Sequence, residues 1–195
     1  MKKRRLWFRL IKRGLIGLLV IVIGLGLFFQ TSYAQKLFYP YPYRPIVEKY
    51  AVQYGVDPFL VIAVIRAESN FMPQSQSHKG AQGLMQLMPD TAEWIAKSKG
   101  DKSFTLEDLK DPEKNIQYGT WYLASLQKEF NNTTLVLAAY NGGRGHVQEW
   151  IKTQQLDIDH LRVEDIPFQE TRKYVQRVLF YYPKYKALYS TGLQG

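Results

Sequence analysis

The sequence predicts an all-α fold, and two observations carry this prediction. Helix signals recur after position 45, as Asp-Pro pairs that begin helices and glycines that end them. Apolar residues in the same part of the chain recur at helical rather than alternating intervals, and no stretch reads as a convincing pair of strands. With 195 residues, 46% of them hydrophobic, the chain has room for one globular domain once its N-terminus is set aside.

The basic residues are concentrated at the N-terminus. The formal net charge is +9, from 26 Lys and Arg against 17 Asp and Glu. Seven of the bases lie in the first thirteen positions with no acid among them, so the remainder carries 19 bases against 17 acids, or +2. A duplex-binding module concentrates its positive charge on the folded part. The distribution therefore argues against nucleic acid as a partner.

An uncharged apolar run at residues 14–29 follows the basic segment. This combination is typical of membrane targeting, and the positive-inside rule exports everything after the run. The run is short for a full membrane span, and Ser32-Tyr33-Ala34 offers small residues at the positions that a signal peptidase reads. Residues 1–35 are therefore predicted to be a signal anchor, which we favour, or a signal peptide. The absence of cysteine excludes a lipoprotein anchor and a disulfide framework.

A Tyr/Pro-rich stretch at residues 39–45 comes next. Each proline restricts its predecessor and removes a backbone donor, so the stretch is predicted to be an extended spacer. We assign residues 36–45 to a linker and residues 46–190 to the folded domain. A ligand for a proline-recognition module is the alternative interpretation of the spacer.

Helix ends are marked at several positions of the folded domain. Asp57-Pro58 and Asp111-Pro112 each supply an N-cap and a proline at the first helical position, and Gly55 and Gly142-Gly143 are stops. The predicted helices are residues 46–54, 58–70, a long segment from 112, 133–141 and 167–189. Asp90 and Glu93 follow Pro89 and read as acids in the first turn of one more helix.

Glu68 is the candidate catalytic residue. It lies just after the apolar run 59–65, and its spacing places it on the helix face of Val61, Val64 and Ile65. Apolar neighbours disfavour the ionised carboxylate, and a raised pKa is what a general acid working near neutral pH needs. An ordinary surface glutamate at a helix end is the alternative, which position alone favours.

Three motifs change that balance. The segments Glu68–Phe71, Gly83–Pro89 (GLMQLMP) and Ala139–Gly143 (AYNGG), with Ile166–Thr171 and Tyr174 behind them, closely resemble the lytic transglycosylases of the soluble-lytic-transglycosylase (SLT) type, glycoside hydrolase family 23. These enzymes share a lysozyme-like fold with goose-type lysozyme. The resemblance covers roughly residues 46–188 and implies that the folded domain is a lysozyme-like catalytic domain. The family more often has alanine where Gly142 stands, and the large superhelical domain of some relatives has no counterpart.

The resemblance implies that Glu68 is the sole catalytic acid and base. The residues it implies at the sugar cleft are Ser77, Gln86, Met88, Tyr140, Asn141, Glu170 and Tyr174. Considered by themselves, Met88 reads as core, Tyr140 as a packed ring and Asn141 as part of a helix stop. Gln86 instead puts an amide in an apolar segment, where it needs a partner that a sugar acetamido group would supply.

The implied reaction is cleavage of the β-1,4 bond between N-acetylmuramic acid and N-acetylglucosamine in peptidoglycan. It forms a 1,6-anhydro ring and requires neither a metal ion nor an organic cofactor. The three histidines show no metal-ligand spacing, and with no cysteine a zinc site is not expected. We expect a monomer that acts outside the cytoplasm on peptidoglycan glycan strands, anchored to the cytoplasmic membrane through its N-terminal segment or secreted to the cell wall.

Two other functions compete with this prediction. A goose-type lysozyme-like hydrolase would use the same glutamate on water, giving reducing ends in place of anhydro ends. A noncatalytic cell-wall binding protein would use Glu68 only to hold a sugar. Muropeptide analysis of digested sacculi separates all three, because it reports both cleavage and the type of product.

Overall fold

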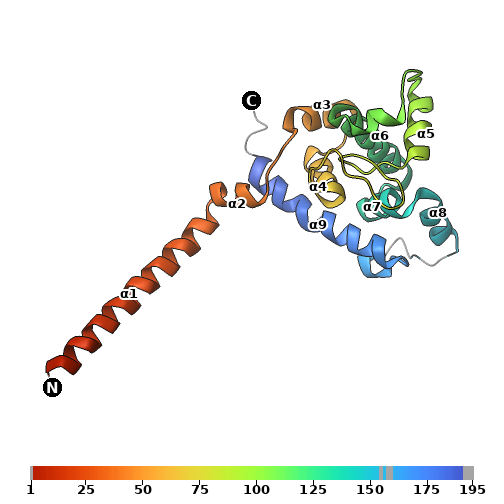
Figure 1. Cartoon of the computed structure of the whole chain (residues 1–195). Helices are drawn as coiled ribbons and strands as arrows, with labels where there is room; N and C mark the ends of the chain where they lie inside the picture. The colour runs from red at the N-terminus through yellow and green to blue at the C-terminus, as the bar shows by residue number, and fades with distance from the viewer. Residues whose placement is uncertain (1, 154–155, 157–159, 191–195) are drawn as a thin grey trace. The chain divides into compact units, whose positions relative to one another are not determined.

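The computed structural model describes residues 2–153, 156 and 160–190 (Figure 1). Its elements in chain order are α1 Lys2–Gln30, α2 Ser32–Phe38, α3 Arg44–Tyr54, α4 Pro58–Ser69, α5 Pro89–Lys99, η1 Leu106–Lys110, α6 Pro112–Phe130, α7 Thr133–Gly142, α8 Arg144–Lys152, η2 Val163–Asp165 and α9 Gln169–Tyr189. Within these residues no strand is formed, and the β pairing consists of isolated bridges. The all-α prediction is confirmed.

The chain divides into two compact units, Met1–Pro40 and Tyr41–Gly195. The first contains α1 and α2. Its segment Lys12–Gln30 is a continuous helix of 19 residues with a mean hydropathy of 2.0, long and apolar enough by length and composition to cross a membrane. The segment is longer than the apolar run at residues 14–29 because the helix includes the flanking residues. This is the N-terminal apolar helix that the sequence predicted.

The linker predicted at residues 36–45 is shorter in the structure. Residues up to Phe38 belong to α2, and α3 already begins at Arg44, with Pro45 at a position where a helix needs no backbone donor. Tyr41 also departs from the picture of a free spacer, because its ring packs 6.5 Å from that of Phe59 and 5.3 Å from that of Tyr189. Burial of apolar rings thus draws the end of the spacer onto the folded unit.

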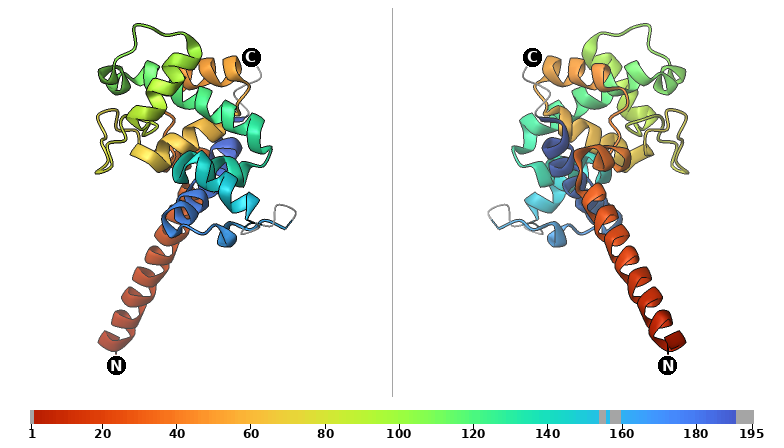
Figure 2. Two further views of the ribbon diagram at one scale, coloured as in Figure 1. Left: turned by 90° about the vertical axis from the view of Figure 1, so that its right-hand side faces the viewer. Right: turned by 90° about the vertical axis from the view of Figure 1, so that its left-hand side faces the viewer.

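The second unit is built around α4. Its residues 59–65 are all buried, so the helix is apolar on every face and must be covered on all sides. It contacts α3 and α9, while α7 contacts α6, α8 and α9. Figures 1 and 2 show α4 enclosed within this unit, with the irregular loop that leads to α5 beside its C-terminal end. The last turn of α4, which carries Glu68, therefore opens towards that loop.

Most predicted helix boundaries agree with the structure. Asp57 caps α4 and Asp111 caps α6, each accepting a backbone N–H, while Gly55 ends α3 in the left-handed region. Helix α8, which the sequence pattern did not predict, begins immediately after Gly143. The two glycines stop α7 but allow a new helix to start at once, because Gly143 adopts a φ of 96° that redirects the chain.

The Asp57 side chain links α4 to α9, and we predict that its removal destabilises the protein. One carboxylate oxygen accepts the Phe59 N–H at 2.8 Å, and the other accepts the Tyr182 hydroxyl at 2.6 Å and the Lys186 ammonium at 3.2 Å. We expect Asp57→Ala to lower the free energy of unfolding by about 1–2 kcal/mol, measured by denaturant titration at pH 7.

The pH dependence provides the control for this prediction. Burial opposes ionisation of Asp57, but the hydrogen bonds from Tyr182, Phe59 and Lys186 outweigh it and hold the pKa of the carboxyl below its usual value. The stabilisation is therefore present above the unfolded pKa and lost as the pH falls through the lower, folded one. A wild-type advantage over Asp57→Ala that did not shrink in acid would contradict this account.

Candidate active site

Glu68 lies in the last turn of α4 and remains partly accessible to solvent. Burial among its neighbours raises the pKa of Glu68 to about 8, and repulsion from Glu170 adds to this, whereas Tyr174 and Arg177 act in the opposite direction. Among the carboxyl groups that the structure describes, the others with resolved shifts have lowered pKa values. Glu68 therefore holds a proton near neutral pH and can donate it to a leaving oxygen.

Two tyrosines from different helices face Glu68. Burial first, and then the nearby Glu68 carboxyl, raise the pKa values of Tyr140 in α7 and Tyr174 in α9 well above their ordinary value, so both hydroxyls stay protonated. The Tyr140 hydroxyl donates to the Met85 carbonyl at 2.8 Å. The buried Tyr174 hydroxyl interacts with Glu68 but makes no hydrogen bond of regular geometry within the described residues. Because the Tyr140 hydroxyl already donates to Met85, the Tyr174 hydroxyl is the better placed of the two to donate a hydrogen bond to Glu68 when that carboxyl ionises.

The loop between α4 and α5 is held beside Glu68 by side chains from three helices. Ser69 Oγ donates to the Leu84 carbonyl at 2.8 Å, and Tyr140 donates to the Met85 carbonyl. Asn115 in α6 is fully buried and accepts the Met85 N–H at 2.8 Å. Its amide nitrogen donates to the Gln82 and Leu109 carbonyls at 3.0 and 2.8 Å. The loop is thus fixed through its backbone, as an irregular segment at a functional site needs to be.

Ser77 and Gln86 have structural partners inside this loop. The Ser77 hydroxyl accepts the Ala81 N–H at 3.0 Å, closing a turn. The Gln86 side-chain nitrogen donates to the carbonyls of Ser75 and Gly83 at 3.0 and 2.9 Å. The partner that the Gln86 amide needs is therefore backbone, and both of its donors are already engaged. Its positive φ of 47° is a strained conformation that these bonds maintain.

Asn141 and Glu170 line a common hollow of about 450 Å³ between the end of α7 and the start of α9. The hollow lies next to the catalytic candidate, because the Glu170 carboxylate acts on the pKa of Glu68. Glu170 itself is exposed and pairs with Lys79 at 3.1 Å. Gly142 also lines the hollow, and a Cβ there would lie 2.9 Å from Thr171 Oγ1, so glycine permits the close approach of α7 to α9.

Met88 precedes α5 and is 41% exposed, so it is not a core residue as its sequence context alone suggested. The structure therefore brings Glu68, Tyr140 and Tyr174 together, and Asn141 and Glu170 around a neighbouring hollow. Ser77 and Gln86 instead brace the loop. The roles of these residues towards a ligand stay predictions.

Sequence reasoning missed Arg177 and Asn115. The charge of Arg177 lowers the pKa of Glu68, and its position three residues after Tyr174 on α9 is a signal that could have placed it on the same helix face. Asn115 gave no such signal, since an asparagine in the first turn of a helix is ordinarily exposed. No group of three or more candidate metal ligands occurs in the described part of the chain.

Comparisons with known proteins all find similarity to lytic transglycosylases. The family model "Transglycosylase SLT domain" matches residues 45–161. The chain is 37% identical over 166 residues, 80% of its length, to the soluble lytic murein transglycosylase of Escherichia coli. It is 43% identical over 117 residues, 54% of its length, to the membrane-bound lytic murein transglycosylase C of Edwardsiella ictaluri, of which it covers 32%.

A solved structure supports the same likeness at the level of the fold. The 70-kDa soluble lytic transglycosylase of Escherichia coli superposes with a TM-score of 0.72 and 34% identity, over 81% of this chain and 26% of that one. The chain spans about a quarter of the length of the first curated relatives it matches, since it covers 26% of the Escherichia coli enzyme.

Proposed function

The chain belongs to the transglycosylase SLT family, and from that premise we propose that it is a lytic transglycosylase of peptidoglycan. It cleaves the β-1,4 bond between N-acetylmuramic acid and N-acetylglucosamine and leaves a 1,6-anhydro-muramyl end. The observation that carries the proposal is Glu68, a carboxyl group with a pKa raised to about 8 at the end of the buried helix α4, which interacts with two protonated tyrosines, Tyr140 and Tyr174.

In the proposed reaction Glu68 first acts as the general acid. It donates its proton to the glycosidic oxygen as the bond to the muramyl C1 breaks, and the muramyl acetamido group stabilises the positive charge that develops. The carboxylate then takes the proton of the muramyl C6 hydroxyl, whose oxygen bonds to C1 and closes the anhydro ring. The proton that left Glu68 is thus restored, and no water is consumed.

The surroundings of Glu68 suit both steps. Burial favours the protonated form of Glu68, which donates the proton in the first step. The hydrogen bond from Tyr174 and the charge of Arg177 favour the ionised form, which accepts the proton in the second step. Glu170 is the other carboxylate that acts on Glu68, but it is exposed and paired with Lys79, so we assign it to binding rather than to nucleophilic attack. A single acid is sufficient when the substrate supplies its own nucleophile.

The N-terminal unit fits an enzyme tethered to a membrane. The helix Lys12–Gln30 is long and apolar enough to span, and relatives of the chain include membrane-bound lytic murein transglycosylases. We propose that the catalytic unit works outside the cytoplasmic membrane with α1 as its anchor. Release by cleavage after Ala34 is the alternative, and N-terminal sequencing of the protein from membrane and soluble fractions distinguishes the two.

The type of product tests the proposed reaction. We expect purified sacculi treated with the full-length protein to release muropeptides with 1,6-anhydro ends, identified by mass spectrometry. A goose-type hydrolase would instead give reducing ends, and a binding protein would give no soluble product. Either of these results would reject the transglycosylase assignment.

A further inference from the structure

The solvent-facing side of α9 is basic and aromatic. Its exposed and partly exposed side chains recur every three or four residues and so share one face, the outer face, made up of Lys173, Gln176, Arg177, Phe180 and Lys184. Four of them, with Tyr181, line a hollow of about 470 Å³. Figure 1 shows α9 along one side of the folded unit. We propose that the outer face docks onto anionic phospholipid headgroups of the membrane that holds the chain. This inference rests on the membrane anchor of the proposed function.

Positive charge on α9 gathers on this face. The helix contains five bases and one acid, namely Arg172, Lys173, Arg177, Lys184, Lys186 and Glu170. Two of the bases are held elsewhere, since Arg172 donates to a backbone carbonyl and Lys186 pairs with Asp57. The acid is already paired with a lysine of the loop between α4 and α5. Within the described residues neither Lys173 nor Arg177 forms an ion pair. The face thus presents uncompensated positive charge, which complements a surface of phosphates.

Phe180 projects from the middle of these bases. Its ring is 55% exposed, whereas the apolar side chains on the inner side of α9 are buried. The Lys184 ammonium lies 4.8 Å from the centre of the Phe180 ring, and the Tyr181 ring lies 5.5 Å from it, centre to centre. Bases interleaved with an exposed aromatic ring are typical of helices that lie on membranes, where the ring enters the headgroup layer and the cations meet phosphates. The face therefore suits a lipid surface better than bulk water.

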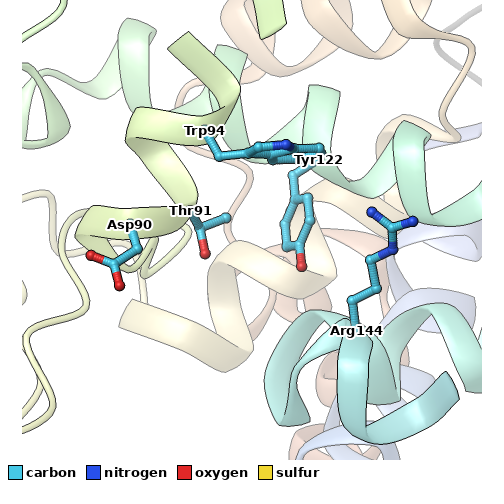
Figure 3. Close-up of a pocket in the computed structure, with 5 residues that line it drawn as sticks. All are labelled: Asp90, Thr91, Trp94, Tyr122 and Arg144. Carbon is cyan, nitrogen blue, oxygen red and sulfur yellow. The ribbon is translucent and has the colours of Figure 1, made fainter. Parts of the chain in front are cut away.

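A second hollow shows that an exposed ring alone does not make such a face. It measures about 230 Å³ and is lined by Asp90, Thr91, Trp94, Tyr122 and Arg144 (Figure 3). Trp94 is 41% exposed, but the base beside it is accompanied by an acid, and the Nε of that base is paired with Glu129 at 2.6 Å. The Tyr122 ring lies 5.4 Å from that of Tyr140, which places this hollow in the surroundings of Glu68. The outer face differs because its bases have no acid among them.

The chain enters the folded unit beside one end of α9. The Tyr41 ring packs 5.3 Å from that of Tyr189 and 6.2 Å from that of Tyr185, both in the last turns of α9. Tyr41 lies eleven residues after Gln30, where the apolar helix ends, and eleven residues span at most about 40 Å. A membrane that holds α1 therefore keeps the outer face at a high effective concentration of headgroups, so individually weak contacts suffice for docking.

Occupation of the outer face leaves the catalytic site open. Tyr174, which interacts with Glu68, is buried, whereas Lys173 just before it is exposed. Successive residues of a helix point about 100° apart, so these two side chains lie on different sides of α9. Docking would fix the orientation of the catalytic unit and favour cleavage of strands next to the membrane. Arg177 stands nearest the boundary, since its charge acts on Glu68, and the test therefore leaves it unchanged.

Fluorescence quenching by lipid headgroups tests the docking. The chain contains no cysteine, so a fluorophore can be attached at Gln176→Cys on the outer face and, in a second protein, at the exposed position Ser98→Cys in α5. Figures 1 and 2 show α5 across the folded unit from α9. The full-length proteins are reconstituted in vesicles that carry a quencher on a headgroup. With equal parts of phosphatidylglycerol and phosphatidylcholine we expect stronger quenching at residue 176 than at residue 98. With phosphatidylcholine alone, or at high salt, the difference should vanish.

Removal of charge from the outer face should release it. Each basic residue near an anionic surface strengthens binding about fivefold, so Lys173→Gln with Lys184→Gln should lower the ratio of docked to free units roughly 25-fold. Phe180→Ala should also reduce the quenching, because less apolar surface enters the headgroup layer. Lys97→Gln with Lys102→Gln removes the same charge from exposed positions elsewhere and is the matched control, which should leave the quenching unchanged.

The outcomes separate this inference from the proposed reaction. Equal quenching at the two labelled positions in anionic vesicles would overturn the docking, as would quenching at residue 176 that persists without anionic lipid or survives Lys173→Gln with Lys184→Gln. Protection of the Gln176→Cys thiol by soluble polyphosphate, without quenching in vesicles, would assign the face to a wall polyanion and overturn the docking likewise. In each case digestion of sacculi in detergent should be unimpaired. A full-length protein that does not float with vesicles would overturn both the docking and the anchor.

Discussion

Glu68→Gln is expected to remove the activity of the protein while increasing its stability. Glutamine keeps the shape of the side chain but can neither donate a proton to the glycosidic oxygen nor accept one from the C6 hydroxyl. General acid–base catalysis contributes roughly 10²–10⁴-fold to a rate, so release of muropeptides from sacculi should fall by at least about 100-fold. For the wild-type protein we expect release to decline as the pH rises through about 8, where Glu68 loses its proton.

The gain in stability follows from the direction of the pKa shift. A carboxyl group whose folded pKa is about 8 and whose ordinary value is 4.5 favours the folded state in its protonated form. The contribution of this carboxyl to wild-type stability is therefore fully present below about pH 4.5 and is lost progressively as the pH rises to about 8. The glutamine side chain introduced by Glu68→Gln does not ionise, so at pH 7 the variant should be more stable by roughly 3 kcal/mol.

Thermal unfolding of the full-length protein in detergent at several pH values measures this effect. The difference between Glu68→Gln and wild type should be smallest near about pH 4 and should grow with pH. Glu93→Gln, which changes an exposed glutamate in α5, is the matched control and should alter neither release nor unfolding. A Glu68→Gln protein that digests sacculi normally, or one no more stable than wild type at pH 7, would contradict the environment assigned to this carboxyl.

Asn115→Leu should have the largest effect on folding. The substitution keeps the size of the side chain but removes the Asn115 partner of two buried backbone groups, the Met85 N–H and the Leu109 carbonyl. It also removes one of the two hydrogen bonds to the Gln82 carbonyl, which still accepts the Leu87 N–H. Each unsatisfied buried group costs about 1–3 kcal/mol, so we expect a loss of about 3–5 kcal/mol in the free energy of unfolding, measured by denaturant titration. Sacculus digestion should fall too, because the loop beside Glu68 loses its attachment.

A second substitution at the same position tests the direction of the bonds. Asn115→Asp places a carboxylate oxygen against two carbonyl oxygens, so it should be at least as destabilising although it is chemically conservative. Gln117→Leu, on the same helix, is the control and should stay within about 0.5 kcal/mol of wild type. If Asn115→Leu unfolds like Gln117→Leu, the loop is not held by this side chain.

The sequence by itself predicted most of the helices, though not α8, and singled out Glu68 as the candidate carboxyl. Asp57-Pro58, Asp111-Pro112 and Gly55 act through their own neighbours in the chain, so their positions predict helix ends without knowledge of the fold. Glu68 could be singled out because it follows an apolar run at helical spacing and because the ordered motifs resemble those of a known family. The helix-end signals act between neighbouring residues, and the resemblance to the family depends only on the order of the motifs in the sequence.

Only the tertiary structure decided what surrounds that carboxyl. Tyr140 and Tyr174 reach Glu68 from helices far along the chain, and neither contact is encoded in any spacing near residue 68. The same holds for Gln86, whose amide was expected to need a ligand and finds backbone carbonyls, and for Trp94, whose neighbours come from α6. The burial of Glu68, which raises its pKa, depends on packing between segments that are distant in the sequence. The sequence could therefore predict the direction of the pKa shift, but the extent of burial follows only from the folded chain.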